Sequence, residues 1–327
     1  MWEGARPDPA RRALLLGALA ALPALAGCGV RLEDDAPHVP LLPTREPVPA
    51  ESLLTALTRD TLRLAGLAAA TPGALAADLA PLHVRQHTVL RGALIARGVP
   101  AEALGTPSAT PEPTTSASPS PTGTASPSPA PSAGATAASA VATLAAAEAS
   151  AAAAANRFTD VEADLRVTVA ALHAQRYAAA RLLTGRAPAV PTDPVAGDVV
   201  EELAAHTAGA TYLLEVAAAR SSGAQRRRAR ATLVVLAELF TDQVAGGSRP
   251  EDSLGIPLPF PVATAADAAR LARTALTALR DAHGARLEPL LSTLGAPGWA
   301  AATRWLGTVE AECHRWGVPL APFPGLT

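Results

Sequence analysis

The chain has 327 residues, of which 49% are hydrophobic and only 3% aromatic, and its net charge is −2. This charge excludes a global field that recruits nucleic acid. All basic residues are arginine, which excludes Schiff-base chemistry and a P-loop lysine. Much of the hydrophobic fraction is alanine, which favours helices but buries little apolar area per residue. The composition therefore predicts helices that pack closely.

The first 27 residues have the features of a secretory signal peptide. Arg6, Arg11 and Arg12 form a positive leader, and an uncharged run of fourteen residues follows, Ala13 to Ala26. A run of this length is too short to span a hydrocarbon core of ~30 Å as a resident helix. Arg11 and Arg12 also form a twin-arginine pair, so both the Sec route and the twin-arginine route stay open. We expect residues 1–27 to be absent from the mature protein.

The signal peptide ends in the sequence Leu25-Ala26-Gly27-Cys28, which resembles a bacterial lipobox. The resemblance implies cleavage before Cys28 and attachment of a diacylglycerol, with palmitate, to this residue. A thiol is a nucleophile that can accept such a lipid; the alternative is an ordinary buried cysteine. We expect a lipid on Cys28 to anchor the protein at the extracytoplasmic face of the cell membrane. Cys313 then has no partner, which excludes a disulfide framework.

The composition divides the rest of the chain into four parts. A proline-rich tether covers 28–49 and should be extended. A first helical unit covers 50–184, and a linker at 185–195 leads to a second unit at 196–327. Residues 105–135 contain almost only Pro, Ser, Thr, Ala and Gly, a composition that cannot bury a core. We interpret this segment as a disordered insert within the first unit.

Helical periodicity runs through both units, and no strand pattern competes with it. In the first unit it predicts helices at about 50–70, 74–97, 136–156 and 160–184. In the second unit it predicts helices at about 196–220, 224–245, 263–284 and 298–317, with a shorter piece at 285–294 before the last. The predicted fold is all-α: two tandem up-down four-helix bundles.

Three segments carry a family resemblance: EELAAHTAGATYLLEVAAA at 201–219, PLPFPV at 257–262 and RWGVPLAPFPGL at 315–326. Through them the second unit resembles a ferritin-like domain family of unknown function found in actinobacterial lipoproteins. The first unit is similar to a diverged ferritin-like partner domain. The resemblance implies a ferritin-like fold and a location in the cell envelope, and it supplies no established activity.

Ferritin-like di-iron centres need Glu-x-x-His pairs, because residues at i and i+3 share one helix face. None of the seven histidines has a glutamate three positions before it, which argues against an intact di-iron centre. The first unit keeps polar residues near its inner stripe: Asp60, Gln86, Glu148 and Arg176, flanked by His83 and His173. We interpret them as a degenerate metal site in which Arg176 pairs with Asp60 or Glu148. In the alternative interpretation, these side chains lie at the edge of the bundle and reach solvent.

In the second unit, the helical pattern places His206 and Glu310 at a similar height along the bundle axis. We expect a buried hydrogen bond between them, since buried polar groups must be satisfied. The alternative is an iron, manganese or zinc site formed by His206, Glu310, Glu202 and His283. A separate cluster, Arg226 to Arg228 with Arg230, is either a solvated first turn or a contact for anionic lipid headgroups.

No other catalytic motif is present. The sequence therefore favours a non-enzymatic binding or scaffolding module, held at the membrane through the lipid on Cys28, without nucleic acid as a partner. The competing hypothesis is a metal-binding or redox protein that uses iron, manganese or zinc. In a third hypothesis, an exposed groove takes a peptide or a lipid, and an apolar pocket between the two bundles would support it. The ligand, the oligomeric state and the arrangement of the bundles stay open.

Overall fold

The computed structural model describes residues 45–106, 133–249 and 256–326, and in these residues the chain is all-helical, as predicted. The predicted signal peptide, Arg11, Arg12, Cys28 and most of the tether lie outside them. Residues 47–327 form one compact unit that contains every described helix. Within the described residues, no helix combines the length and the hydropathy that crossing a membrane requires.

The first half of the fold has four α-helices: α2 (Glu51–Ala70), α3 (Ala74–Ala96), α4 (Ala133–Ala153) and α5 (Ala163–Thr184). α2 packs against α3, and α4 packs against α5. The predicted insert at 105–135 lies mostly outside the described residues, but α4 already begins at its end, three residues before the predicted start. A short 3-10 helix, Ala155–Phe158, separates α4 from α5, close to the break that the pattern predicts between 156 and 160.

The second half has α6 (Asp198–Ala219), α7 (Gly223–Val244), α8 (Ala265–Ala285) and α9 (Leu287–Arg315). α6 packs against both α7 and α8, and α8 packs against α9. α9 consists of two helices joined at Gly295, whose φ of 54° and ψ of −138° are not helical. Pro297 lies in the first turn of the second helix, where its missing N–H is not needed. This break corresponds to the two separate pieces that the sequence predicts.

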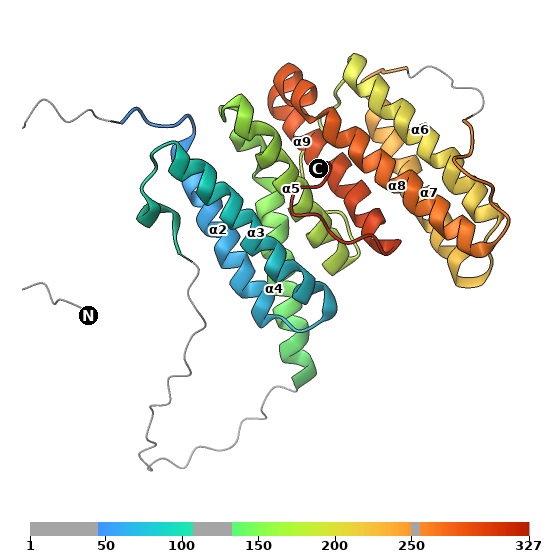
Figure 1. Ribbon diagram of the computed structural model, residues 1–327, viewed down its shortest axis with the longest axis horizontal. Coiled ribbons are helices and arrows are strands. Elements are labelled where there is room, and N and C mark those ends of the chain that lie inside the picture. The colour runs from blue at the N-terminus through green and yellow to red at the C-terminus, as the bar shows by residue number, and fades with distance from the viewer. Residues whose placement is uncertain (1–44, 107–132, 250–255, 327) are drawn as a thin grey trace, which may run out of the picture. The chain divides into compact units, whose positions relative to one another are not determined.

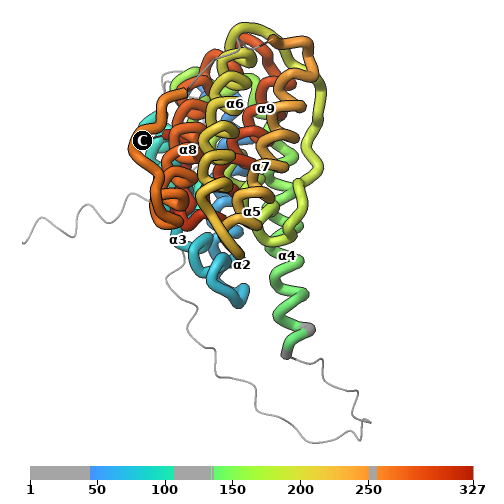
Figure 2. Tube along the Cα trace, turned by 90° about the vertical axis from the view of Figure 1, so that its right-hand side faces the viewer, coloured from blue at the N-terminus to red at the C-terminus, as the bar shows by residue number. Residues whose placement is uncertain are grey.

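The two halves meet where α5 lies against α9 (Figures 1 and 2). All residues from Val169 to Ala180 on α5 are buried, and so are all residues from Gly298 to Cys313 on α9. A helix that is buried on every side needs small residues where backbones approach. Gly307 is such a residue, because a Cβ atom there would lie 2.6 Å from the carbonyl oxygen of Ala174. The close packing expected from the alanine-rich composition is found at this contact.

We expect Gly307→Ala to destabilise the fold by about 1–3 kcal/mol, because the added methyl group forces α5 and α9 apart. Gly66→Ala is the matched control: Gly66 is also helical, but a Cβ there meets nothing within 4 Å. The control should stabilise the protein by about 0.5–1 kcal/mol through helix propensity. Chemical denaturation of both variants measures the difference. Equal stabilisation by both would contradict a tight contact at Gly307.

After α9 the chain turns at Gly317 and runs without helix or strand to Leu326, with a second turn at its end; we call this segment the C-terminal strap. The strap is fixed to both halves. The backbone N–H of Ala321 donates to Glu310 on α9 at 2.6 Å, and the carbonyl of Pro322 accepts from Gln86 on α3 at 2.6 Å. Gly325 lies so close to Gly284 on α8 that a Cβ at either position would overlap the backbone of the other glycine.

Candidate functional site

A cluster of polar side chains is buried at mid-helix in the first half. One oxygen of Glu148 on α4 lies 2.7 Å from Nε2 of His83 on α3, and the other lies 3.4 Å from the guanidinium of Arg176 on α5. All three side chains have an exposed fraction of 0%. The cluster therefore fastens three helices together, and a substrate can reach it only if the helices separate.

The hydrogen bonds of Gln86 fix the proton on one nitrogen of His83. Nε2 of Gln86 donates both to Oε1 of Gln175 at 3.0 Å and to the carbonyl of Pro322 at 2.6 Å. Its Oε1 therefore faces His83, and Nδ1 of His83 must donate the hydrogen bond of 3.1 Å between them. The second nitrogen, Nε2, is left to face Glu148.

The charge of Arg176 favours the ionised form of Glu148. Burial raises the pKa of Glu148, but the charge of Arg176 and the hydrogen bond with His83 outweigh burial, and the net pKa lies below its ordinary value of 4.5. Glu148 is therefore the charge partner of Arg176, and it also lies within hydrogen-bonding distance of His83.

Arg176 is the poorly satisfied member of this cluster. Its Nε and one terminal nitrogen are buried without a hydrogen-bond partner, and so is Nε2 of the adjacent Gln175. His173, nearby on α5, is neutral: burial, together with the charge of Arg176, lowers its pKa to about 4, although a hydrogen bond from Nδ1 to the carbonyl of Ala151 acts in the opposite direction. The cluster is thus held mainly by Glu148.

Of the four predicted inner residues, the structure brings Gln86, Glu148 and Arg176 together and leaves Asp60 at the edge. Asp60 forms an ion pair of 2.6 Å with Arg63, one turn further along α2, and its side chain is 31% exposed. The buried stripe of α2 includes Leu57, Thr61 and Leu64, and residue 60 lies beside it. Arg176 therefore pairs with Glu148, and Asp60 acts on it only through its charge.

The predicted hydrogen bond between His206 and Glu310 is wrong. His206 is exposed on α6, whose buried stripe includes Leu203, Thr207 and Leu214. Glu310 is buried and instead accepts hydrogen bonds from the N–H of Ala321 and from Arg280 at 3.4 Å. Burial raises the pKa of Glu310, although both of these contacts lower it.

The remaining candidate ligands in the second half also have other partners. Glu202 is exposed and paired with Arg286, and buried His283 contacts Gln243 and the carbonyl of Leu279. In the described part of the chain, no three or more His, Cys, Asp or Glu side chains are grouped so that they can hold a metal ion. Burial, with the charge of Glu310, raises the pKa of Cys313 to about 12, so this thiol stays protonated.

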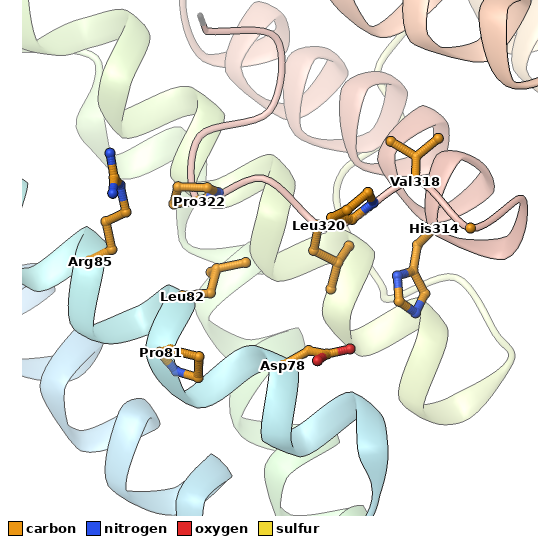
Figure 3. A pocket seen from close by; sticks show the side chains of 10 residues that line it. Asp78, Pro81, Leu82, Arg85, His314, Val318, Leu320 and Pro322 are labelled. Carbon is orange, nitrogen blue, oxygen red and sulfur yellow. The ribbon is translucent and has the colours of Figure 1, made fainter.

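An open groove of about 560 Å³ lies between α3 and the C-terminal strap. This volume is in the range of small-molecule and cofactor sites. The side chains of Leu320 and His314 point across the groove toward Asp78 on α3 (Figure 3). The wall on the α3 side carries Asp78, Pro81, Leu82 and Arg85, and the opposite wall carries His314, Gly317 to Leu320 and Pro322. The groove is therefore apolar between charged ends, and both halves of the fold contribute to it.

The buried cluster holds one wall of this groove in place. Gln86 is fixed by His83 on one side and holds the carbonyl of Pro322 on the other, and Pro322 lines the groove. Sequence reasoning missed this link. Prolines at 319, 322 and 324 prevent the helix from continuing, but no local pattern indicates that the strap returns to α3, 236 residues earlier in the chain.

Comparison with known proteins does not extend this description. No family model matches the chain, and no curated protein or solved structure matches it either.

Proposed function

We propose that this chain is a lipid-anchored, extracytoplasmic binding module without catalytic activity, and that the groove between α3 and the C-terminal strap is its ligand site. The lipobox-like sequence at Cys28, after a charged leader and a short apolar run, supports the anchor. We further propose that each half is a ferritin-like four-helix bundle. The helix order and the resemblance of residues 201–219 support this fold.

The groove is the observation that carries the proposed function. It lies between the two halves, as a peptide- or lipid-binding groove would, and it is rigid because the strap is hydrogen-bonded to Gln86 and to Glu310. Exposed Asp78 and Arg85 lie on one face of α3, seven residues apart. Their Cα atoms are therefore separated by about 10.5 Å along the helix axis. Leu82, between them, provides the apolar floor.

This spacing favours a short peptide as the ligand. An extended tripeptide with free termini separates its two charges by about 10 Å, which matches the spacing of Asp78 and Arg85. Asp78 then binds the ammonium group of the peptide, and Arg85 binds its carboxylate. The middle side chain then faces Leu82 and Leu320.

We expect the tripeptide Ala-Leu-Ala to bind this groove saturably, with NMR shifts confined to α3 and the strap. Arg85→Gln should weaken binding about two- to fivefold, the range for one exposed ion pair, and amidation of the peptide carboxylate should have the same effect. Arg59→Gln, an exposed arginine on α2, is the control and should bind like the unmodified protein.

Shifts that map elsewhere, or no saturation, would contradict the groove as a peptide site. Stoichiometric iron, manganese or zinc in the purified protein would favour the metal-handling alternative instead.

A further inference from the structure

Five arginines surround the first turns of α7: Arg220 before it, then Arg226, Arg227, Arg228 and Arg230. We call this group the arginine surface. All five are exposed, and in the described part of the chain none of them forms an ion pair within 4.0 Å of a carboxylate. Other exposed arginines, such as Arg63, do pair with carboxylates.

For the four arginines on α7, this placement is unfavourable within the chain. Cations near the start of a helix oppose its dipole, and Ser222, the N-cap residue of α7, makes no side-chain capping hydrogen bond that would offset the effect. Repulsion among neighbouring guanidinium groups adds to the cost. One of the five has a favourable contact: Arg228 lies over the ring of Trp316, 5.6 Å from its centroid.

Two carboxylates on adjacent helix ends, Asp267 and Glu312, are already engaged. Gln225 donates to the carbonyl of Ala265, which places the start of α8 beside α7, and there Asp267 caps its own helix through Thr264. At the end of α9, Glu312 accepts from Thr232 and pairs with Arg315. Neither of these two carboxylates is therefore left for the arginine surface.

We propose that the arginine surface docks on the anionic lipid headgroups of the membrane. This proposal uses the anchor proposed above only to choose the partner. From Cys28 to Pro47 there are nineteen residues, which extend to about 60 Å. A helix of 22 residues such as α7 is only about 33 Å long, so a tethered molecule can bring either end of its helices to the bilayer. The net charge of −2 disfavours nucleic acid as the partner.

The test uses residues 29–327 without any lipid, because this chain contains the whole compact unit 47–327. We expect it to sediment with vesicles that contain phosphatidylglycerol, and not with pure phosphatidylcholine vesicles. Each arginine near an anionic surface strengthens binding about fivefold. Replacing Arg226, Arg227 and Arg230 by Gln should therefore lower the vesicle partition coefficient about a hundredfold, and salt should weaken binding of the unmodified chain.

The matched control replaces Arg59, Arg157 and Arg249 by Gln. It changes the net charge equally at scattered exposed positions, and it should keep nearly full binding. Circular dichroism checks that both triple variants stay folded. Equal loss in the two variants, no binding to the anionic vesicles, or preferential binding to duplex DNA would each overturn the proposal. A failure of lipidation at Cys28 leaves this test unaffected, so the two proposals fail separately.

Discussion

Glu148→Gln is expected to destabilise the protein by about 3–5 kcal/mol, the range for removing one partner of a buried ion pair. The variant keeps the shape of the side chain but removes its charge. Arg176 then remains a buried cation without a carboxylate, and His83 no longer faces a charged oxygen. Urea denaturation at neutral pH measures the loss, with near-ultraviolet circular dichroism to confirm that the variant folds.

Arg176→Met is the informative counterpart. Methionine fills much of the same volume, and the substitution removes two buried nitrogen groups that have no hydrogen-bond partner. It also leaves the hydrogen bond between His83 and Glu148 in place. We therefore expect a smaller loss in the free energy of unfolding than for Glu148→Gln, because Glu148 keeps a partner and two unpaired buried nitrogens are removed. A loss as large as that of Glu148→Gln would contradict the view that Arg176 is the poorly satisfied member of this cluster.

Stability should fall as the pH is lowered from 6.5 toward 4, because His173 and His283 are buried and neutral. Burial lowers the pKa of each from 6.5 to about 4, with hydrogen bonds to Ala151 and Leu279 acting in the opposite direction. Between these pH values the unfolded chain binds protons that the folded chain does not, so acid favours unfolding. Each histidine should account for a loss of about 3 kcal/mol by pH 4.

Variants separate this effect from other titrations. His173→Asn and His283→Asn should each flatten the stability profile between pH 6.5 and 4.5. Glu148 titrates below that window because its pKa is lowered, and Glu310 acts in the opposite direction because burial raises its pKa. Urea denaturation at several pH values gives the profile. If it kept the same slope in both variants, the histidines would not be its cause.

The helices could be predicted from the sequence because their ends are marked locally. Gly73, Gly185, Gly197 and Gly223 adopt positive φ at helix boundaries, and apolar residues recur with helical spacing between them. Most predicted boundaries therefore lie within about two residues of those in the structure. The start of α4 follows a segment without large apolar residues, and there the periodic signal is too weak to locate the boundary.

The candidate site was less predictable, because alanine makes helix faces ambiguous. The buried stripe of α6 is displaced by about one residue from the predicted stripe, and this displacement leaves His206 exposed. The neighbouring alanines are compatible with either position of the stripe. α5 and α9 are buried all round, so for them no single face exists to predict. The strap depends on contacts between residues more than two hundred positions apart, which no local pattern encodes.

The central claim is that a binding module is held at the outer face of the membrane by a lipid on Cys28. Mass spectrometry of the N-terminal peptide of the membrane-extracted protein tests it most directly. The account predicts that the mature chain begins at Cys28 with a diacylglycerol on its sulfur, and that Cys28→Ser leaves the precursor uncleaved. A mature chain that begins elsewhere, or that carries an unmodified thiol at Cys28, would contradict the account.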